Sequence, residues 1–177
     1  MRQILFVCTG NIFRSLTAEH ALRHVLGNRR AIVVSSAGTD DRMCTVDPVV
    51  SDYLRSRGID VSRHRRRTLT AEMLQPSVTV IAMSTDHRAF LARQFGCYDV
   101  VLFTQACGLP PAPLLDVHEA IADSDSNQMA RKAYIHLTID RILQLTPQLA
   151  RRLIGFKGSE GLRQQDYRID MTKRCRP

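Results

Sequence analysis

A cysteine, an arginine and several small polar residues share a short segment near the start of this 177-residue chain. Residues 8–15 read Cys-Thr-Gly-Asn-Ile-Phe-Arg-Ser, directly after an apolar run at residues 4–7. A thiolate is a strong nucleophile, and an arginine offers a planar fork that matches two oxygens of a phosphate group. The spacing therefore predicts a nucleophile, Cys8, below a phosphate group that Arg14 holds.

The residues around this pair predict a loop whose backbone binds the same anion. A tightly wound loop turns successive N–H groups inward, and a helix that begins near Arg14 adds the positive end of its dipole. Gly10 permits a positive φ, and Asn11 also tolerates one. Ser15 can hydrogen-bond the cysteine sulfur. The predicted phosphate-binding residues are Thr9, Gly10, Asn11, Ile12, Phe13 and Ser15.

Short apolar strands that alternate with helices must position this loop. Strands are predicted at 3–8, 31–35, 78–83 and 100–103, and helices follow each of them. The first helix is expected to bury Ala18, Ala21, Leu22, Val25 and Leu26. A long closing helix is expected to bury Met129, Ala133, Leu137, Ile142 and Leu145. This order predicts an α/β fold with a central four-stranded parallel sheet, helices on both faces and the phosphate-binding loop after the first strand.

The length and composition predict one domain over residues 1–154, and a basic polar tail over 155–177 that is expected to be peripheral or disordered. No apolar run is long enough to span a membrane, and the N-terminal run is too short for a signal peptide. The five cysteines are odd in number and show no CxxC spacing. This pattern argues against a disulfide framework or a structural zinc site, and it favours a reducing cytoplasm.

The net charge of +8 indicates either an anionic partner or a basic, solvated surface. Nucleic-acid binding through the run Arg63–Arg67 would rest on charge alone, because no aromatic residues are interleaved with these arginines. We therefore expect no nucleic-acid partner. The sequence carries no indication of oligomeric state.

Four segments of the chain resemble parts of the low-molecular-weight protein tyrosine phosphatase family; one of them is Ile81-Ala82-Met83 followed by His87, which fits the third strand and its exit. Residues 7–15 match its V-C-x-G-N-x-x-R-S signature. Residues 35–39, Ser-Ser-Ala-Gly-Thr, match its S-A-G-T segment. Residues 58–65, which include His64 and Arg65, match its G-I-D-x-S-x-H-R segment. The resemblance covers roughly residues 2–150.

This resemblance implies a phosphatase that needs no cofactor and no metal. Its substrates would be phosphorylated proteins, most often on tyrosine, or small phosphomonoesters, and its product inorganic phosphate. The reaction would pass through a phosphocysteine on Cys8. By position, the resemblance also implies that Asn11, Ser15, Ser36 and His64 form a polar network that holds the loop in shape.

The general acid is the part of the family pattern that this chain matches least. The family uses the aspartate of D/E-V-x-D-P, and this chain reads Asp116-Val117-His118-Glu119-Ala120. This register predicts that Glu119 protonates the leaving oxygen. Asp123 is the competing candidate, because a shifted loop would bring it forward. A third interpretation makes both acids solvent-facing residues near the start of the closing helix.

Other departures bear on the substrate. Phe13 stands where many relatives carry a second loop cysteine, and Ile12 stands where relatives that act on phosphoarginine tend to carry threonine. Arg42 and Ile121 stand near positions that are often aromatic in phosphotyrosine-specific relatives. An alternative to an enzyme is therefore a phosphate-binding or phosphoprotein-binding module that turns over poorly because its acid loop has diverged.

Overall fold

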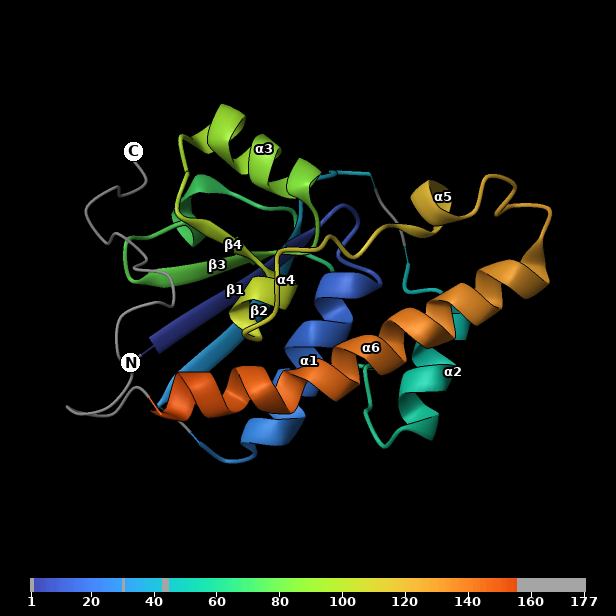
Figure 1. Cartoon of the computed structure of the whole chain (residues 1–177), viewed down its shortest axis with the longest axis horizontal. Coiled ribbons are helices and arrows are strands. Elements are labelled where there is room, and N and C mark those ends of the chain that lie inside the picture. Colours follow the sequence, from blue (N-terminus) through green and yellow to red (C-terminus); the bar gives the residue numbers. More distant parts are fainter. Residues whose placement is uncertain (1, 30, 43–44, 156–177) are drawn as a thin grey trace.

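Four parallel strands form the central sheet of the computed structural model, which describes residues 2–29, 31–42 and 45–155 (Figure 1). The strands are β1 (Arg2–Cys8), β2 (Ile32–Gly38), β3 (Val78–Ala82) and β4 (Val100–Leu102), in the spatial order β2-β1-β3-β4. The chain thus moves to one side of β1 and then crosses to the other. The loop after β1 lies at this switch point, where ligands of open parallel sheets bind. The predicted sheet is confirmed.

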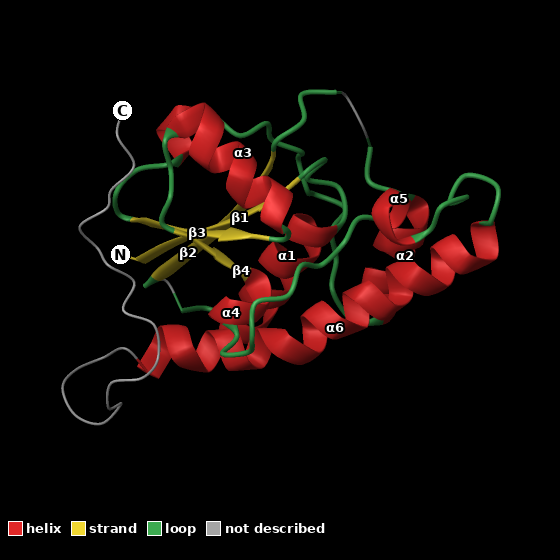
Figure 2. Cartoon of the chain, turned by 45° about the horizontal axis from the view of Figure 1, so that its top comes forward, coloured by secondary structure: helices red, strands yellow, loops and turns green. Residues whose placement is uncertain are grey.

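Helices cover both faces of the sheet (Figure 2). α1 (Arg14–Leu26), α2 (Pro48–Ser56) and α6 (Gln128–Gly155) lie on one side, and α3 (Thr85–Phe95) lies on the other. Shorter elements are the 3₁₀ turn Ala71–Met73, α4 (Phe103–Ala106) and α5 (Val117–Ala120). Successive β1 side chains point to opposite faces, so Phe6 packs in the cluster with α1 and α6, whereas Val7 packs in the cluster with α3.

Local sequence signals set the bounds of α1 and α2. Asp47 caps α2 by accepting a hydrogen bond from the N–H of Val49 at 2.8 Å, and Pro48 occupies the first turn. Gly27 ends α1 with a φ of 56°, a conformation that glycine adopts without steric cost. Both helices follow the predicted positions. The second strand continues past its predicted end at Ser35, as far as Gly38.

The predicted buried faces of two helices need correction. Val25 of α1 and Ala133 of α6 are exposed, as are Met129 (85%) and Leu137 (68%). At 3.6 residues per turn, Met129 lies about 140–160° around the helix axis from Ile142 and Leu145, so one face cannot hold all three. The buried residues of α6 are Ile135, Thr138, Ile139, Ile142, Leu145, Thr146, Leu149 and Ala150.

The predicted tail over 155–177 lies outside the described residues, apart from Gly155 at the end of α6. Among the described cysteines, Cys8 and Cys107 are free thiols, whereas Cys97 is disulfide-bonded. The expectation of reduced cysteines therefore fails at Cys97, because spacing along a sequence says little about pairing in space. In the part of the chain that the structure describes, no helix combines the length and the apolar character that a membrane span requires.

Candidate active site

Cys8 is the last residue of β1, and its sulfur has hydrogen-bond partners in the loop that follows and at the start of α1. The backbone N–H of Asn11 lies 3.3 Å from Cys8 Sγ, and the hydroxyl of Ser15 lies 2.8 Å from it. The amide group of Asn11 donates to Ser15 Oγ at 3.1 Å. The hydroxyl of Ser15 keeps its own proton while it accepts this bond, so it can donate to Cys8 when the sulfur is a thiolate. Both bonds stabilise negative charge on Cys8.

Asn11 holds the loop in shape. Its φ is 55°, so Asn11, and not Gly10, supplies the positive φ that the sequence left open between the two. The side-chain nitrogen also donates to Ser36 Oγ at 2.6 Å, and the side-chain oxygen accepts the N–H of Arg67 at 2.9 Å. This buried side chain thus joins the loop to β2 and to the segment that follows Val61.

Gly38 at the end of β2 lets the loop pack directly against the strand. A Cβ atom at this position would lie 2.6 Å from the carbonyl oxygen of Thr9 and 3.1 Å from the nitrogen of Asn11. Beside it, the N–H groups of Thr39 and Asp40 donate to the carbonyls of Cys8 and Thr9, at 2.9 and 3.0 Å. The close approach of two backbones explains why glycine occupies this position.

Ser36 and His64 complete the predicted polar network. The hydroxyl of Ser36 donates to the buried carboxylate of Glu19. His64 Nε2 lies 3.0 Å from the carbonyl oxygen of Asn11, which can only accept, so this nitrogen carries the proton. Burial is the main cause that lowers the pKa of His64 below its usual value. The structure therefore brings together the four residues that the family resemblance grouped: Asn11, Ser15, Ser36 and His64.

Arg14, the first residue of α1, is 1% exposed. Its guanidinium donates to the carbonyl oxygen of Leu114 at 2.8 Å and to Thr9 Oγ1 at 3.2 Å, and it forms an ion pair with Asp116. The sequence used Asp116 only to set the register of the acid loop and did not predict this contact. Asp116 and Leu114 lie on the segment after α4, about a hundred residues away, so no local pattern could have placed them here.

His87 is a second residue near the loop that the sequence did not assign to the site. The N–H of Ser84 donates to His87 Nδ1 at 3.0 Å, which places the proton of the neutral ring on Nε2. That nitrogen donates to Thr9 Oγ1 at 3.1 Å. Burial, and next the charge of Arg14, lower the pKa of His87 to about 4. Ser84 followed three positions later by the polar His87 is the spacing of a helix capping box, and this spacing was the signal in the sequence that could have placed His87 at the start of α3.

The structure places the two candidate acids differently. Glu119 in α5 lies 3.9 Å from Arg14 Nη1, and its Oε2 accepts the N–H of Asp116 at 2.5 Å. Asp123 is exposed, and its backbone carbonyl accepts the N–H groups of Ser126 and Asn127. Of these two candidate acids, Glu119 is therefore the one that lies near Arg14.

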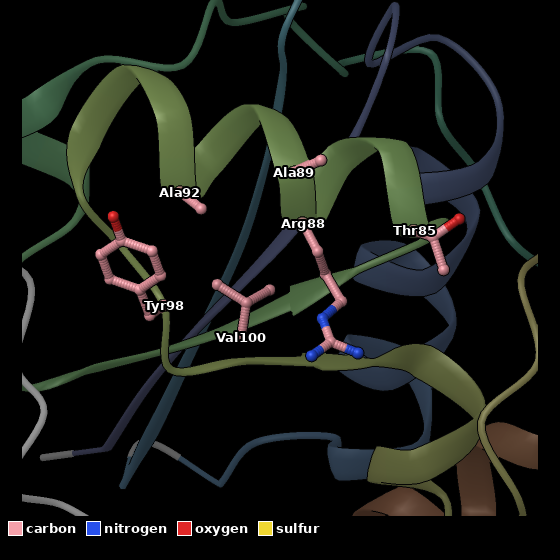
Figure 3. Close-up of a pocket in the computed structure, with 6 residues that line it drawn as sticks. All are labelled: Thr85, Arg88, Ala89, Ala92, Tyr98 and Val100. Atoms are coloured by element: carbon pink, nitrogen blue, oxygen red, sulfur yellow. The ribbon is translucent and has the colours of Figure 1, made fainter.

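A separate hollow lies between α3 and β4, with a volume of about 280 Å³ (Figure 3). Its lining residues are Thr85, Arg88, Ala89, Ala92, Tyr98 and Val100. None of these residues belongs to the loop between β1 and α1. The chemistry-bearing residues therefore gather at the carboxyl end of β1 and not in this hollow.

The fold and the site define a class of protein: a parallel α/β domain whose first loop joins a buried cysteine to an arginine at the start of a helix. The sequence profile described as "Low molecular weight phosphotyrosine protein phosphatase" matches residues 3–153. The chain belongs to this family.

Characterised relatives of this family cover both tyrosine and arginine phosphatases. The chain is 37% identical over 87 residues to the low molecular weight protein-tyrosine-phosphatase Etp of Escherichia coli K12. The matched residues cover 49% of this chain and 57% of Etp. The chain is 35% identical over 104 residues to a protein-arginine-phosphatase of Bacillus subtilis, 57% of this chain and 68% of that protein. The match thus spans little more than half the length of Etp.

A solved structure is similar over most of the chain. It is a YwlE arginine phosphatase, in which a serine that replaces the active-site cysteine is phosphorylated. The TM-score is 0.68 at 28% identity, and the match covers 88% of this chain and 97% of that one.

Proposed function

We propose that this chain is a cysteine-dependent phosphatase that hydrolyses phosphomonoesters through a phosphocysteine intermediate. The observation that carries the proposal is the convergence of two hydrogen-bond donors, from Asn11 and Ser15, on the sulfur of Cys8. Asn11 lies in the loop after β1, whereas Ser15 is the second residue of α1, next to the buried Arg14. Family membership over residues 3–153 supports the same chemistry.

In the first step, the thiolate of Cys8 attacks phosphorus while the bond from phosphorus to the leaving oxygen breaks. Glu119 transfers its proton to that oxygen, so the dephosphorylated product leaves as a neutral alcohol or phenol. In the second step, a water molecule attacks phosphorus and gives a proton to the Glu119 carboxylate. The phosphorus–sulfur bond breaks, inorganic phosphate leaves, and Ser15 stabilises the returning thiolate.

Arg14 is proposed to hold the equatorial oxygens of the phosphoryl group, whose charge grows in the transition state. Asp116, Thr9 and the carbonyl of Leu114 fix the position of its guanidinium. His87 supports Thr9 from the other side by donating to its hydroxyl oxygen. These three contacts restrict the rotamers of a long side chain before the substrate binds, which lowers the entropic cost of positioning it.

Phosphotyrosine in proteins is the proposed substrate. Ile12 stands at the loop position where relatives that act on phosphoarginine tend to carry threonine, and this argues against phosphoarginine despite the likeness to YwlE. Arg63, Arg65 and Arg67 are exposed beside the loop, since the neighbouring Arg66 donates to the carbonyl of Gly10 at 3.0 Å. This surface favours acidic phosphopeptides, with a preference that fades as salt rises.

The deciding experiment compares three substrates with the same enzyme: p-nitrophenyl phosphate, an acidic phosphotyrosine peptide and a phosphoarginine protein. We expect turnover of the first two substrates. At low salt, the acidic phosphotyrosine peptide should be preferred over a neutral phosphotyrosine peptide. Turnover of the phosphoarginine protein alone would overturn the substrate assignment. Equal turnover of acidic and neutral peptides at low salt would remove the role of the exposed arginines.

A second candidate function is a phosphate-binding module with weak turnover. The observation that favours it is the bond from the N–H of Asp116 to Glu119 Oε2, because this bond makes Glu119 a helix-capping residue. Under this alternative, the protein binds inorganic phosphate or a phosphopeptide but hydrolyses p-nitrophenyl phosphate no faster than Cys8→Ser does.

A further inference from the structure

Two partly buried histidines meet beside α1, behind the phosphate-binding loop. His20 Nε2 lies 3.4 Å from His64 Nδ1, and the rings pack edge to face. Glu19, His20 and His64 each offer one possible metal-ligand atom, and these three atoms lie within 4.8 Å of one another. His20 comes from α1, one residue after Glu19, whereas His64 comes from the segment between α2 and the 3₁₀ turn.

The separation of the two nitrogens matches the distance between two ligands of one metal ion. Metal–nitrogen bonds of Zn²⁺ are about 2.0–2.1 Å, so two nitrogens on a tetrahedral ion lie about 3.3–3.4 Å apart. The observed 3.4 Å agrees with this value. Without a metal ion, the same contact is a long hydrogen bond between the two rings, since N–H···O bonds in proteins measure about 2.7–3.2 Å.

The protonation of His64 already has the form that a metal ligand needs. Its Nε2 carries the ring proton and donates to the carbonyl of Asn11, so a lone pair on Nδ1 faces His20. A ligating histidine commonly donates its second N–H to a backbone carbonyl or a carboxylate in this way. His20 presents a lone pair of its own when its proton is on Nδ1, a change of tautomer and not of charge.

Glu19 supplies the third ligand. Its carboxylate is buried; one oxygen contacts Arg23, at 2.7 Å, and the other contacts Ser36 and, at 3.7 Å, the exposed Arg67. Arg23 also donates to the carbonyl of Val34 at 2.6 Å and is half exposed, so it keeps a partner when one carboxylate oxygen turns toward a metal. Ser36 can hold the other oxygen as before. Two imidazoles and one carboxylate form a ligand set that Zn²⁺ accepts, whereas Mg²⁺ prefers oxygen ligands alone.

We propose that Glu19, His20 and His64 form a binding site for Zn²⁺ that is coupled to the phosphate-binding loop. The coupling runs from the imidazole of His64 to the carbonyl of Asn11, whose N–H donates to Cys8. The metal takes no part in the proposed hydrolysis. The sequence analysis argued against a structural zinc site from cysteine spacing and against a catalytic metal from the family resemblance, and neither argument considered these three residues.

The test uses the Cys8→Ser chain, because a reactive thiolate could itself bind zinc and because binding can then be measured whether or not the protein is a phosphatase. Isothermal titration with ZnCl₂ should show one site per chain, which MgCl₂ does not occupy. Adding His20→Gln should weaken Zn²⁺ binding by about tenfold or more, since even residues that only orient a ligand are worth about 10–100-fold.

His24→Gln is the matched control, because His24 is exposed one turn further along α1. It should leave the affinity unchanged. His20→Cys, which replaces one zinc ligand with another, should restore binding and the rise in melting temperature that Zn²⁺ causes in the parent. Equal affinity for Zn²⁺ in the parent and His20→Gln would overturn the proposal, as would an equal loss in His24→Gln or no binding in the parent.

Discussion

The side chains of Arg14 and Asp116 form an ion pair between residues 102 positions apart in the chain. Arg14 is almost fully buried, and Asp116 is partly exposed. A buried charge that loses its partner is costly, so this pair fixes both the arginine and the acid loop that carries Glu119. A phosphate group that binds Arg14 must share the guanidinium with the Asp116 carboxylate.

The first prediction follows from this sharing. Asp116→Asn keeps the shape of the side chain but removes the negative charge beside Arg14. Inorganic phosphate should therefore inhibit the variant several-fold more strongly, while kcat falls because the acid loop loses its anchor. The inhibition constant and kcat are measured together. Asp125→Asn, on the exposed turn before α6, is the control and should change neither. Weaker inhibition in Asp116→Asn would contradict this account of Arg14.

Cys8→Ser should abolish phosphatase turnover without unfolding the protein, because a hydroxyl is similar in size to the thiol but is a poorer nucleophile. Hydrolysis of p-nitrophenyl phosphate measures the turnover, and circular dichroism checks the fold. Cys107→Ser serves as the control, because Cys107 is the other free thiol among the described cysteines. Burial raises the pKa of this thiol to about 12, so it should contribute nothing to turnover. Activity that survives Cys8→Ser would rule out a phosphocysteine.

Arg14→Lys should lower kcat by about 10²-fold or more, because an ammonium group cannot reproduce two parallel hydrogen bonds to the phosphoryl oxygens. The loss should be larger in kcat than in binding of inorganic phosphate, since a positive charge remains. Steady-state kinetics and phosphate inhibition separate the two effects. A variant with normal kcat would show that the fork geometry of Arg14 is not needed.

Glu119→Gln should slow hydrolysis most with a poor leaving group, by about 10²–10⁴-fold, the usual scale of general acid catalysis. With an activated leaving group the loss should shrink, because the oxygen departs without a proton. Asp123→Asn is the matched control and should be nearly silent with both substrates. If Asp123→Asn carries the dependence on the leaving group instead, the alignment of the acid loop is wrong by four residues. If neither substitution matters, the binding-module alternative gains support.

His87 should make the protein less stable in acid. Its pKa is lowered to about 4 by burial and by Arg14, whereas a histidine in the unfolded chain titrates near 6.5. Between these two values the unfolded state binds more protons, so the free energy of unfolding falls as the pH drops from about 6.5 to 4. His87→Gln should show a shallower fall over this window in urea titrations. Part of the slope remains, because the pKa values of His20 and His64 are lowered in the same direction.

His24→Gln, a substitution at an exposed position, is the control, and its free energy of unfolding should fall with pH as steeply as that of the parent. A slope in His87→Gln as steep as the parent's would mean that His87 is not buried in its neutral form.

The sequence by itself determined the order of the elements and the content of the loop. Residues 8–15 are contiguous, so an apolar strand, a polar loop and a helix start could be recognised from local patterns. Cys8, Ser15 and Arg14 needed no distant information, because a loop between β1 and α1 places them together by its short length. The cap of α2 at Asp47 was local in the same sense.

Tertiary structure alone decided which distant groups complete the site. Asp116 and the carbonyl of Leu114 reach Arg14, and His87 reaches Thr9, because the carboxyl ends of β1, β3 and β4 meet at one edge of the sheet. Packing also determined which face of α6 is buried. Hydrophobic residues occur on both sides of this helix, so the sequence pattern alone was compatible with burial of either side. Such contacts depend on how the elements pack in three dimensions. The types of two residues that are far apart in the sequence do not show whether packing brings them together.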